Sequence, residues 1–336
     1  MELQLKNIGM IKEANVKLDG LTVIAGENDT GKSTLSKVLF AFVQTLDTSK
    51  YIEARQKRSY DFGEIFDSYI KNIFDNQISK NGSIKIVDIS DDEYHFLLTI
   101  EENKCIEFSI PEIELLDFMD YNISMVESPV IWNFMNIFTQ LPPIEDRMNI
   151  DLNYPAIMKD LHFQLSVANR GNKDSIVKNI KSIIGGEFKQ DTLGAFFFEK
   201  ENQRIELSNT ATGIKYFGIL QVLSRNNYFV ENDILILDEP EVHLHPKWQL
   251  KMAEVIVELV KNGVKVLVNS HSPYMIEALK RYSELAEVNS DFYLAEDGYI
   301  KKENDSNSET LAKIFEKLSE PFDVFEEMDM ERLLNV

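Results

Sequence analysis

The segment at residues 26–34, which reads Gly-Glu-Asn-Asp-Thr-Gly-Lys-Ser-Thr, most constrains what this chain can fold into. It fits G-x-x-x-x-G-K-[ST] without a mismatch. A short apolar run at residues 21–25 precedes it, and a helical pattern follows from about residue 32 to 46. In such a loop the glycines let successive backbone N–H groups face a phosphate at the positive end of the next helix. The sequence therefore predicts a strand, a phosphate-binding loop and a helix, in that order.

The side chains of this loop suit a nucleotide that is bound with a metal ion. Lys32 would neutralise the β- and γ-phosphates, and Ser33 would offer its hydroxyl to Mg²⁺. We therefore expect ATP and Mg²⁺ as cofactors. The residues of this segment that we expect to bind them are Gly26, Asn28, Gly31, Lys32, Ser33 and Thr34.

Two adjacent acids follow a second apolar run, at residues 234–237. Asp238, at the carboxyl end of this expected strand, would hold Mg²⁺ or its water shell, and Glu239 would polarise the attacking water. Acids are common in turns, so the pair alone is equally compatible with a strand cap. Together with a complete phosphate loop, it predicts nucleotide hydrolysis.

Three histidines lie near these segments. His243 and His245 allow a zinc site as an alternative, but no third ligand lies nearby in the sequence, and a loop at a subunit contact fits better. His271 follows an expected strand at residues 264–268 and should reach the same sheet edge as Asp238. Taken alone, His271 would more often be a neighbour of a helix cap than a catalytic residue.

Apolar periodicity predicts an α/β fold with a mainly parallel core sheet, an antiparallel β lobe and a helical lobe. The order of strand, helix and strand at residues 234–268 indicates a right-handed βαβ unit. Three β-like runs between residues 83 and 110 suggest an antiparallel meander. The chain is expected to divide into an N-terminal lobe (1–110), a mostly helical insertion (111–191), a C-terminal half (192–303) and an acidic helical tail (304–336).

The composition restricts the partners of the chain. It has 56 Asp and Glu against 35 Lys and Arg, a formal net charge of -21, so we expect a partner to supply any basic surface for nucleic acid. Its single cysteine, Cys105, suits a reducing compartment. No apolar run is long enough to cross a bilayer, so we expect a cytoplasmic protein without membrane contact.

Taken together, these motifs resemble the ABC-type ATPase heads of the SMC, RecF and OLD (overcoming lysogenization defect) group. The likeness covers roughly the first fifty residues and those from 196 to about 279, including the run Leu-Asp-Glu-Pro-Glu-Val-His-Leu-His-Pro at 237–246. The resemblance implies that Lys32, Ser33 and Thr34 bind phosphate and Mg²⁺. It also implies that Asp238 and Glu239 carry out hydrolysis and that His271 is the switch histidine.

The resemblance also implies a signature loop that contacts the γ-phosphate bound to a second subunit. The candidate is residues 208–215, which contain Thr212 and Gly213 ahead of an expected helix. This loop departs from the usual Leu-Ser-Gly-Gly-Gln, and only Gly213 is clearly kept. We therefore expect a homodimer or higher oligomer in which two copies enclose two ATP molecules.

Compact relatives of this group act in DNA repair or phage defence, often beside a nuclease or another toxic effector. We expect this chain to drive or gate such a separate effector and to lack nuclease activity itself, since no Toprim domain is expected after residue 291. A slow nucleotide-gated scaffold that sequesters a toxic effector is the alternative. A transporter subunit is a third possibility, disfavoured by the poor signature loop.

Overall fold

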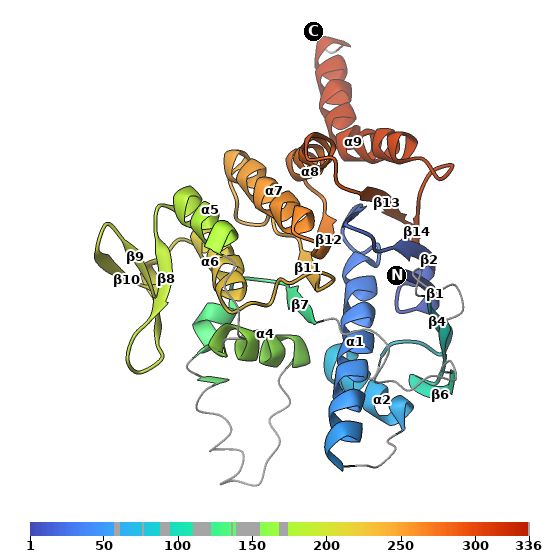
Figure 1. The fold of residues 1–336 in the computed structure, drawn as a ribbon. Helices are drawn as coiled ribbons and strands as arrows, with labels where there is room; N and C mark the ends of the chain where they lie inside the picture. The colour runs from blue at the N-terminus through green and yellow to red at the C-terminus, as the bar shows by residue number, and fades with distance from the viewer. Residues whose placement is uncertain are drawn as a thin grey trace.

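The computed structural model describes residues 1–56, 61–75, 77–87, 95–109, 122–135, 137–138, 155–167 and 174–334 of the chain. Within them a large mixed sheet forms the centre of the molecule, and helices cover its faces. A small antiparallel sheet lies to one side, at the left of Figure 1, and the C-terminal helix extends from the top of the body in this view.

In the described part of the chain, the central sheet has 11 strands in the order β6-β5-β4-β1-β2-β14-β13-β3-β12-β11-β7. One half is parallel and the other is an antiparallel extension, as the sequence predicted. The strands of the parallel half are β3 (Leu21–Ala25), β7 (Ile123–Val126), β11 (Ile234–Asp238), β12 (Lys265–Ser270) and β13 (Ser290–Glu296). The remaining strands are β1 (Glu2–Ile8), β2 (Ile11–Lys17), β4 (Asn81–Val87), β5 (His95–Glu101), β6 (Lys104–Ser109) and β14 (Tyr299–Lys301).

Both faces of the parallel half are buried, which explains why its strands are continuous apolar runs. Leu235 and Leu237 of β11 belong to one hydrophobic core, and the alternate residues Ile234 and Ile236 belong to another. The first core packs against α6 (Thr212–Arg225), α7 (Pro246–Lys261) and α8 (Pro273–Leu285). The second packs against α1 (Lys32–Gln56) and α2 (Phe62–Phe74).

The small sheet packs against α6. Gly218 of α6 makes room for it, since a Cβ there would lie 2.4 Å from the ring of Phe188. Gln221 on the same helix accepts a hydrogen bond from the Phe188 backbone N–H at 2.8 Å. The elements of this region are α4 (Ala156–Ser166), α5 (Asp174–Ile184), β8 (Glu187–Gln190), β9 (Phe196–Lys200), β10 (Gln203–Glu206) and a 3-10 turn (Leu207–Asn209).

The expected division of the chain into four segments stays a prediction. Three of those segments share one sheet, because β3 from residues 1–110, β7 from residues 111–191 and β11 from residues 192–303 all belong to it. Residues 111–121, 136, 139–154 and 168–173 of the expected insertion lie outside the described residues.

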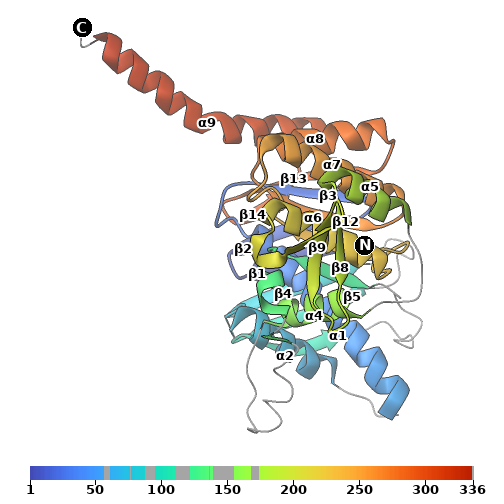
Figure 2. The same ribbon diagram turned by 90° about the vertical axis from the view of Figure 1, so that its left-hand side faces the viewer.

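The tail forms a single helix, α9 (Asn307–Leu334), with Pro321 inside it. Leu311 and Ile314 in its first half are buried in the core under α7 and α8. Phe322 and Phe325 in its second half are 66% and 59% exposed. Figure 2 shows this second half extending beyond the body. The apolar side chains in the first half of α9 are therefore packed within this chain, whereas the described ones in the second half are exposed.

Candidate functional site

The loop between β3 and α1 closes around the side chain of Lys32. The Lys32 Nζ donates hydrogen bonds to the carbonyl oxygens of Gly26 at 2.9 Å and Glu27 at 2.5 Å. Burial lowers the pKa of Lys32, and the charges of Glu239 and Asp238 oppose that shift. The loop therefore holds the lysine cation at the N-terminus of α1. Because the free N–H groups of this helix end also attract negative charge, both features favour a bound anion such as a phosphate.

Two positions in this loop require glycine. Gly31 has φ = 95°, and a Cβ there would lie 2.7 Å from the Cγ1 of Ile11. At Gly26 a Cβ would lie 2.3 Å from the carbonyl oxygen of Ala295, so the end of β13 lies directly against the loop. The glycines of the motif thus serve the close approach of neighbouring strands as well as the curl of the loop.

Parallel pairing brings the ends of β11 and β12 to the same level, where Asp238 lies opposite Asn269. Asn269 Nδ2 donates to Asp238 Oδ1 at 2.7 Å and to Ser36 Oγ at 2.8 Å. Ser33 Oγ donates to the same Asp238 oxygen at 3.1 Å. The fold therefore brings together the two residues, 205 positions apart, that the sequence predicted as metal ligands.

The oxygen atoms at this point suit Mg²⁺ bound together with a nucleotide. A hydroxyl and a carboxylate are hard oxygen donors, and Mg²⁺ is usually held by one or two carboxylates with phosphate oxygens and waters. The Asn269 Oδ1 beside them is buried and has no hydrogen-bond partner among the residues that the structure describes. Among the described residues no group of three or more His, Cys, Asp or Glu could hold a metal by itself. The site thus fits a metal that arrives with ATP.

The histidine pair gives no support to the zinc alternative. His245 is the N-cap of α7, and its Nδ1 accepts from the Lys247 backbone N–H at 3.3 Å. His243 is exposed and has φ = 68°. These roles are those of a loop that turns a strand into a helix.

Glu239 and His271 are in contact. His271 Nδ1 lies 3.2 Å from Glu239 Oε1. Behind them, Glu241 Oε1 accepts hydrogen bonds from Ser270 Oγ at 2.7 Å and from the His271 backbone N–H at 2.9 Å. The Glu241 side chain is 3% exposed, and its Oε2 is buried with no hydrogen-bond partner in the described part of the chain. This buried carboxylate ties the turn after β11 to the end of β12 and so holds His271 beside Glu239.

The phosphate loop and Glu239 line one cavity of about 250 Å³. Its walls include Asn28, Lys32, Ser33 and Thr34, so most of the predicted nucleotide-binding residues face one space. Such a cavity can take a polyphosphate chain with the Glu239 carboxylate at its edge.

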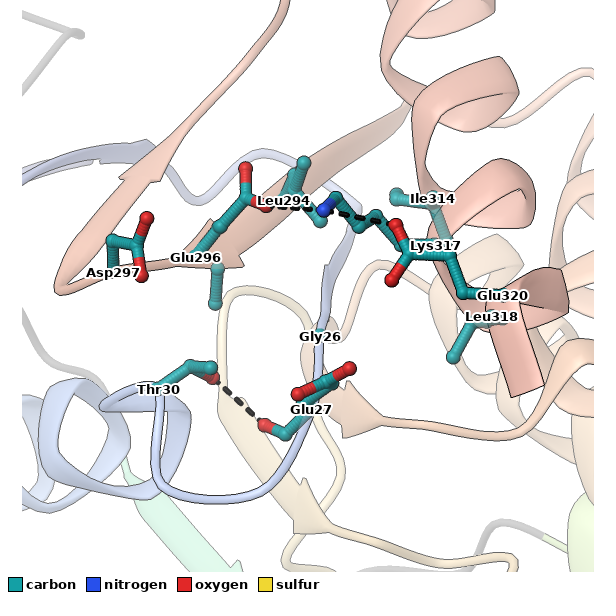
Figure 3. A pocket seen from close by; sticks show the side chains of 11 residues that line it. Gly26, Glu27, Thr30, Leu294, Glu296, Asp297, Ile314, Lys317, Leu318 and Glu320 are labelled. Carbon is teal, nitrogen blue, oxygen red and sulfur yellow. Dashed lines mark hydrogen bonds and ion pairs between the residues drawn. The ribbon is translucent and has the colours of Figure 1, made fainter. Parts of the chain in front are cut away.

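A second cavity of about 320 Å³ adjoins the loop on the side of α9 (Figure 3). Lys317 of α9 lies between Glu296 at 2.9 Å and Glu320 at 3.0 Å, opposite Glu27 and Thr30 of the loop. The first half of α9 thus packs close to the phosphate loop.

Thr212 and Gly213 are not among the residues that line the cavity of the phosphate loop. Both lie at the start of α6, whose N-cap is Ala211. A Cβ at Gly213 would lie 2.8 Å from Leu244 Cδ2, so this glycine packs against the turn that follows Glu239. The predicted signature loop therefore contacts the same turn as the catalytic candidates but does not share their cavity.

Three polar residues of this sheet edge were not predicted: Asn269, Glu241 and Glu127. Glu127 directly follows β7, whose last residue, Val126, pairs with Leu237 of β11 just before Asp238. The Glu127 carboxylate forms an ion pair with Lys37 of α1 at 2.9 Å. No motif marks Glu127 in the sequence. The acid at Glu241 was visible within the histidine-containing run, but its burial depends on contacts with β12 that the local sequence does not reveal.

Comparisons with known proteins agree with this geometry. The family described as AAA ATPase domain (AAA_15) matches residues 133–276. The Septu protein PtuA of Bacillus thuringiensis is 22% identical over 323 residues, covering 82% of this chain and 72% of that protein. None of the helices in the described part of the chain is both long and apolar enough to span a membrane.

Among solved structures, an SMC head bound to the C-terminal winged-helix domain of ScpA is similar with a TM-score of 0.52. It is 17% identical, and the alignment covers 89% of this chain and 95% of that one. The SMC head domain from Thermotoga maritima is 13% identical with a TM-score of 0.45, covering 89% and 96%. Given its phosphate loop, its match to the AAA ATPase domain and the fold that it shares with the ScpA-bound SMC head, the chain is a P-loop ATPase with the fold of an SMC head.

Proposed function

We propose that this chain hydrolyses ATP with Mg²⁺ at the edge formed by Lys32, Ser33, Asp238, Glu239 and His271, and uses the cycle to gate a separate effector. The observation that supports this most is the pairing of two contacts at one sheet edge. Ser33 bonds Asp238, and Glu239 contacts His271, with the phosphate loop and Glu239 lining one cavity.

Each side chain has a role that follows from its place. Lys32, held by two loop carbonyls, would meet the β- and γ-phosphates, and Ser33 and Asp238 would hold Mg²⁺. When bound, the metal would neutralise charge on the phosphates. Glu239 would orient water and accept its proton, which requires a carboxylate free of competing donors. His271, whose Nδ1 lies 3.2 Å from one oxygen of Glu239, would hold this carboxylate in place beside the γ-phosphate.

A second copy would complete the site. Thr212 is exposed at the N-terminus of α6, away from the cavity of its own chain. The free N–H groups at this helix end suit an anion, so two copies facing each other could each direct α6 at the other's γ-phosphate. Association should then strengthen with ATP, because the nucleotide lies in the interface.

The effector is proposed from the resemblance to ATPase heads that act in phage defence and DNA repair, with added support from the likeness to Septu protein PtuA. The net charge of -21 favours a partner, rather than this chain, as the component that contacts DNA. We expect the isolated chain to bind duplex DNA weakly at physiological salt. Submicromolar binding in fluorescence anisotropy would contradict this division of roles.

Light scattering of the Glu239→Gln variant, with and without ATP, tests the proposed pairing. The amide keeps the shape of the side chain but cannot accept a proton, so bound ATP should persist and the mass should double with ATP. A mass that stays monomeric at every concentration with ATP bound would defeat the pairing. Turnover well below about 0.01 per second in the wild type would favour the slow scaffold over a working motor, since enzymes typically turn over at about 1–1000 per second.

A further inference from the structure

Lys215, in the first turn of α6, is a nearly buried cation without a counterion. The residue is 9% exposed, and its ammonium has no hydrogen-bond or ion-pair partner among the described residues. Burial lowers the pKa of Lys215, and no carboxylate opposes that shift, whereas two acids do so at Lys32. A charge that is mostly withdrawn from water is costly unless it is paired. Lys215 therefore has the properties of a residue that pairs with an anion from another molecule.

The helix end around Lys215 also favours an anion. Ala211, the N-cap of α6, provides no side-chain acceptor, and the first turn contains no acidic residue. The first N–H groups of a helix have no partner within it and lie at the positive end of the helix dipole. Side chains on a helix lean towards its N-terminus, so Lys215 leans back over Ala211 and Thr212, which are both exposed. The ammonium and the N–H groups thus suit one anion with several acceptor oxygens, such as a phosphate group.

The start of α6 lies at the sheet edge that carries the proposed ATP site. The Tyr216 hydroxyl donates a hydrogen bond to the carbonyl oxygen of Val126 at 3.3 Å, and Val126 pairs with Leu237, just before Asp238. Burial raises the pKa of Tyr216, and the charge of Asp238 adds to that shift. Lys215 directly precedes Tyr216, so it lies at the same edge as the metal-binding candidates.

The nucleotide of the same chain does not supply this phosphate. No residue of α6 is among the described residues that line the phosphate-loop cavity. A second copy has the same edge, and a two-fold pairing of these edges would bring the start of each α6 to the cavity of the other copy. Ala211 has no hydroxyl to offer there, so a charge at this helix end has to come from Lys215.

We propose that Lys215, with the free N–H groups at the start of α6, binds the γ-phosphate of ATP held by a second copy of this chain. The inference rests on the proposed ATP-driven pairing and names the residue that provides its charge. Lys215 gains a counterion only while a γ-phosphate is present. ATP should therefore favour the pair and ADP should not.

Lys215→Met tests the role of the charge, because methionine keeps an unbranched side chain without the ammonium. Calorimetry should give an unchanged affinity for Mg²⁺-ATP, and the urea midpoint should not fall, since an unpaired charge is removed from the folded state. In the Glu239→Gln background with ATP, the dissociation constant of the pair should rise at least about tenfold, as expected for the loss of a hydrogen bond to a charged group. A purely structural lysine would show the reverse, with a lower urea midpoint and unchanged pairing.

Lys261→Met is the matched control. Lys261 is an exposed lysine in the last turn of α7, at the end of that helix away from Glu239. Its replacement removes the same charge from the chain but should leave pairing and turnover at the wild-type level.

Mixing two inactive variants tests whether Lys215 acts on the other copy. Lys32→Ala should lose ATP from its own cavity, and Lys215→Met should lose the contact to its partner's ATP. A mixed pair has one complete site, made of Lys32 from one copy and Lys215 from the other. An equal mixture should therefore recover about a quarter of the wild-type turnover, because roughly half of the pairs are mixed and one of the two sites in each is complete.

The proposal is overturned if the mixture is no more active than its two components, or if Lys215→Met pairs and hydrolyses ATP like the wild type. Both results leave the proposed ATPase function standing as long as Glu239→Gln still doubles its mass with ATP. A Glu239→Gln variant that stays monomeric with ATP bound would instead overturn the proposed pairing and this inference together.

Discussion

Replacing Glu241 tests whether the buried carboxylate holds the edge of the site together. In Glu241→Ala, the Ser270 hydroxyl and the His271 backbone N–H lose their acceptor. A buried donor left unpaired costs about 1–3 kcal/mol, so two such donors should lower the free energy of unfolding by roughly 3 kcal/mol in total. Glu241→Gln keeps an acceptor oxygen and should lose about 1 kcal/mol or less.

Urea denaturation followed by tryptophan fluorescence measures this difference, because Trp132 and Trp248 lie in or against the core beside α6 and α7. Glu254→Ala is the control: Glu254 is half-exposed and pairs only with Lys251 among the described contacts, so its loss should cost about 0–1 kcal/mol. The reasoning fails if Glu241→Ala lies within about 1 kcal/mol of the wild type. It also fails if Glu241→Ala destabilises no more than Glu241→Gln.

Four further substitutions have definite expected results. Lys32→Ala and Asp238→Ala should each weaken the binding of Mg²⁺-ATP, measured by calorimetry, by at least about tenfold. Each substitution removes a charge that contributes more than about 1.4 kcal/mol to the binding free energy. Unchanged affinity in both variants would remove these residues from the site. Thr212→Arg, at an exposed position, should bind ATP normally but hydrolyse it slowly. It is a cleaner test than Gly213→Arg, because a side chain at Gly213 would clash with Leu244. Turnover by Thr212→Arg at the wild-type rate would refute a role of α6 in a second copy's site. Burial raises the pKa of Asp160 from 3.8 to about 7. Between these pH values the folded state therefore retains a proton that the unfolded chain releases. The resulting stabilisation is fully present below about pH 3.8 and is lost as the pH rises towards 7. Asp160→Asn should therefore raise the free energy of unfolding at pH 8 and change it much less at pH 4, and equal effects at the two pH values in urea titrations would contradict this.

The parts of the fold that the sequence predicted are those that local patterns determine. The strand before the phosphate loop and the strand that ends at Asp238 are wholly apolar, because both faces of a parallel sheet are buried. The phosphate loop and the acid pair are short motifs whose chemistry needs neighbouring residues. Their meeting at one edge follows from parallel pairing, and the Ser33–Asp238 contact confirms it.

The parts that were missed depend on distant partners. β7 lies in an irregular stretch of the sequence, and only its pairing with β11, about 110 residues later, makes it part of the parallel half. Glu127 joins the site edge for that reason. The burial of Glu241 depends on Ser270 and His271, 29 and 30 residues away, which the run of acids and histidines alone does not indicate.

ATP turnover by the wild type and by Glu239→Gln, each measured with Mg²⁺ and with EDTA, tests the central claim most directly. Glu239 lines the cavity of the phosphate loop and contacts His271 at its edge. The account predicts Mg²⁺-dependent turnover by the wild type and a loss of at least about a hundredfold in Glu239→Gln, with ATP still bound, because a general base typically contributes about 100- to 10,000-fold. Turnover by Glu239→Gln at the wild-type rate, or turnover that persists in EDTA, would contradict it.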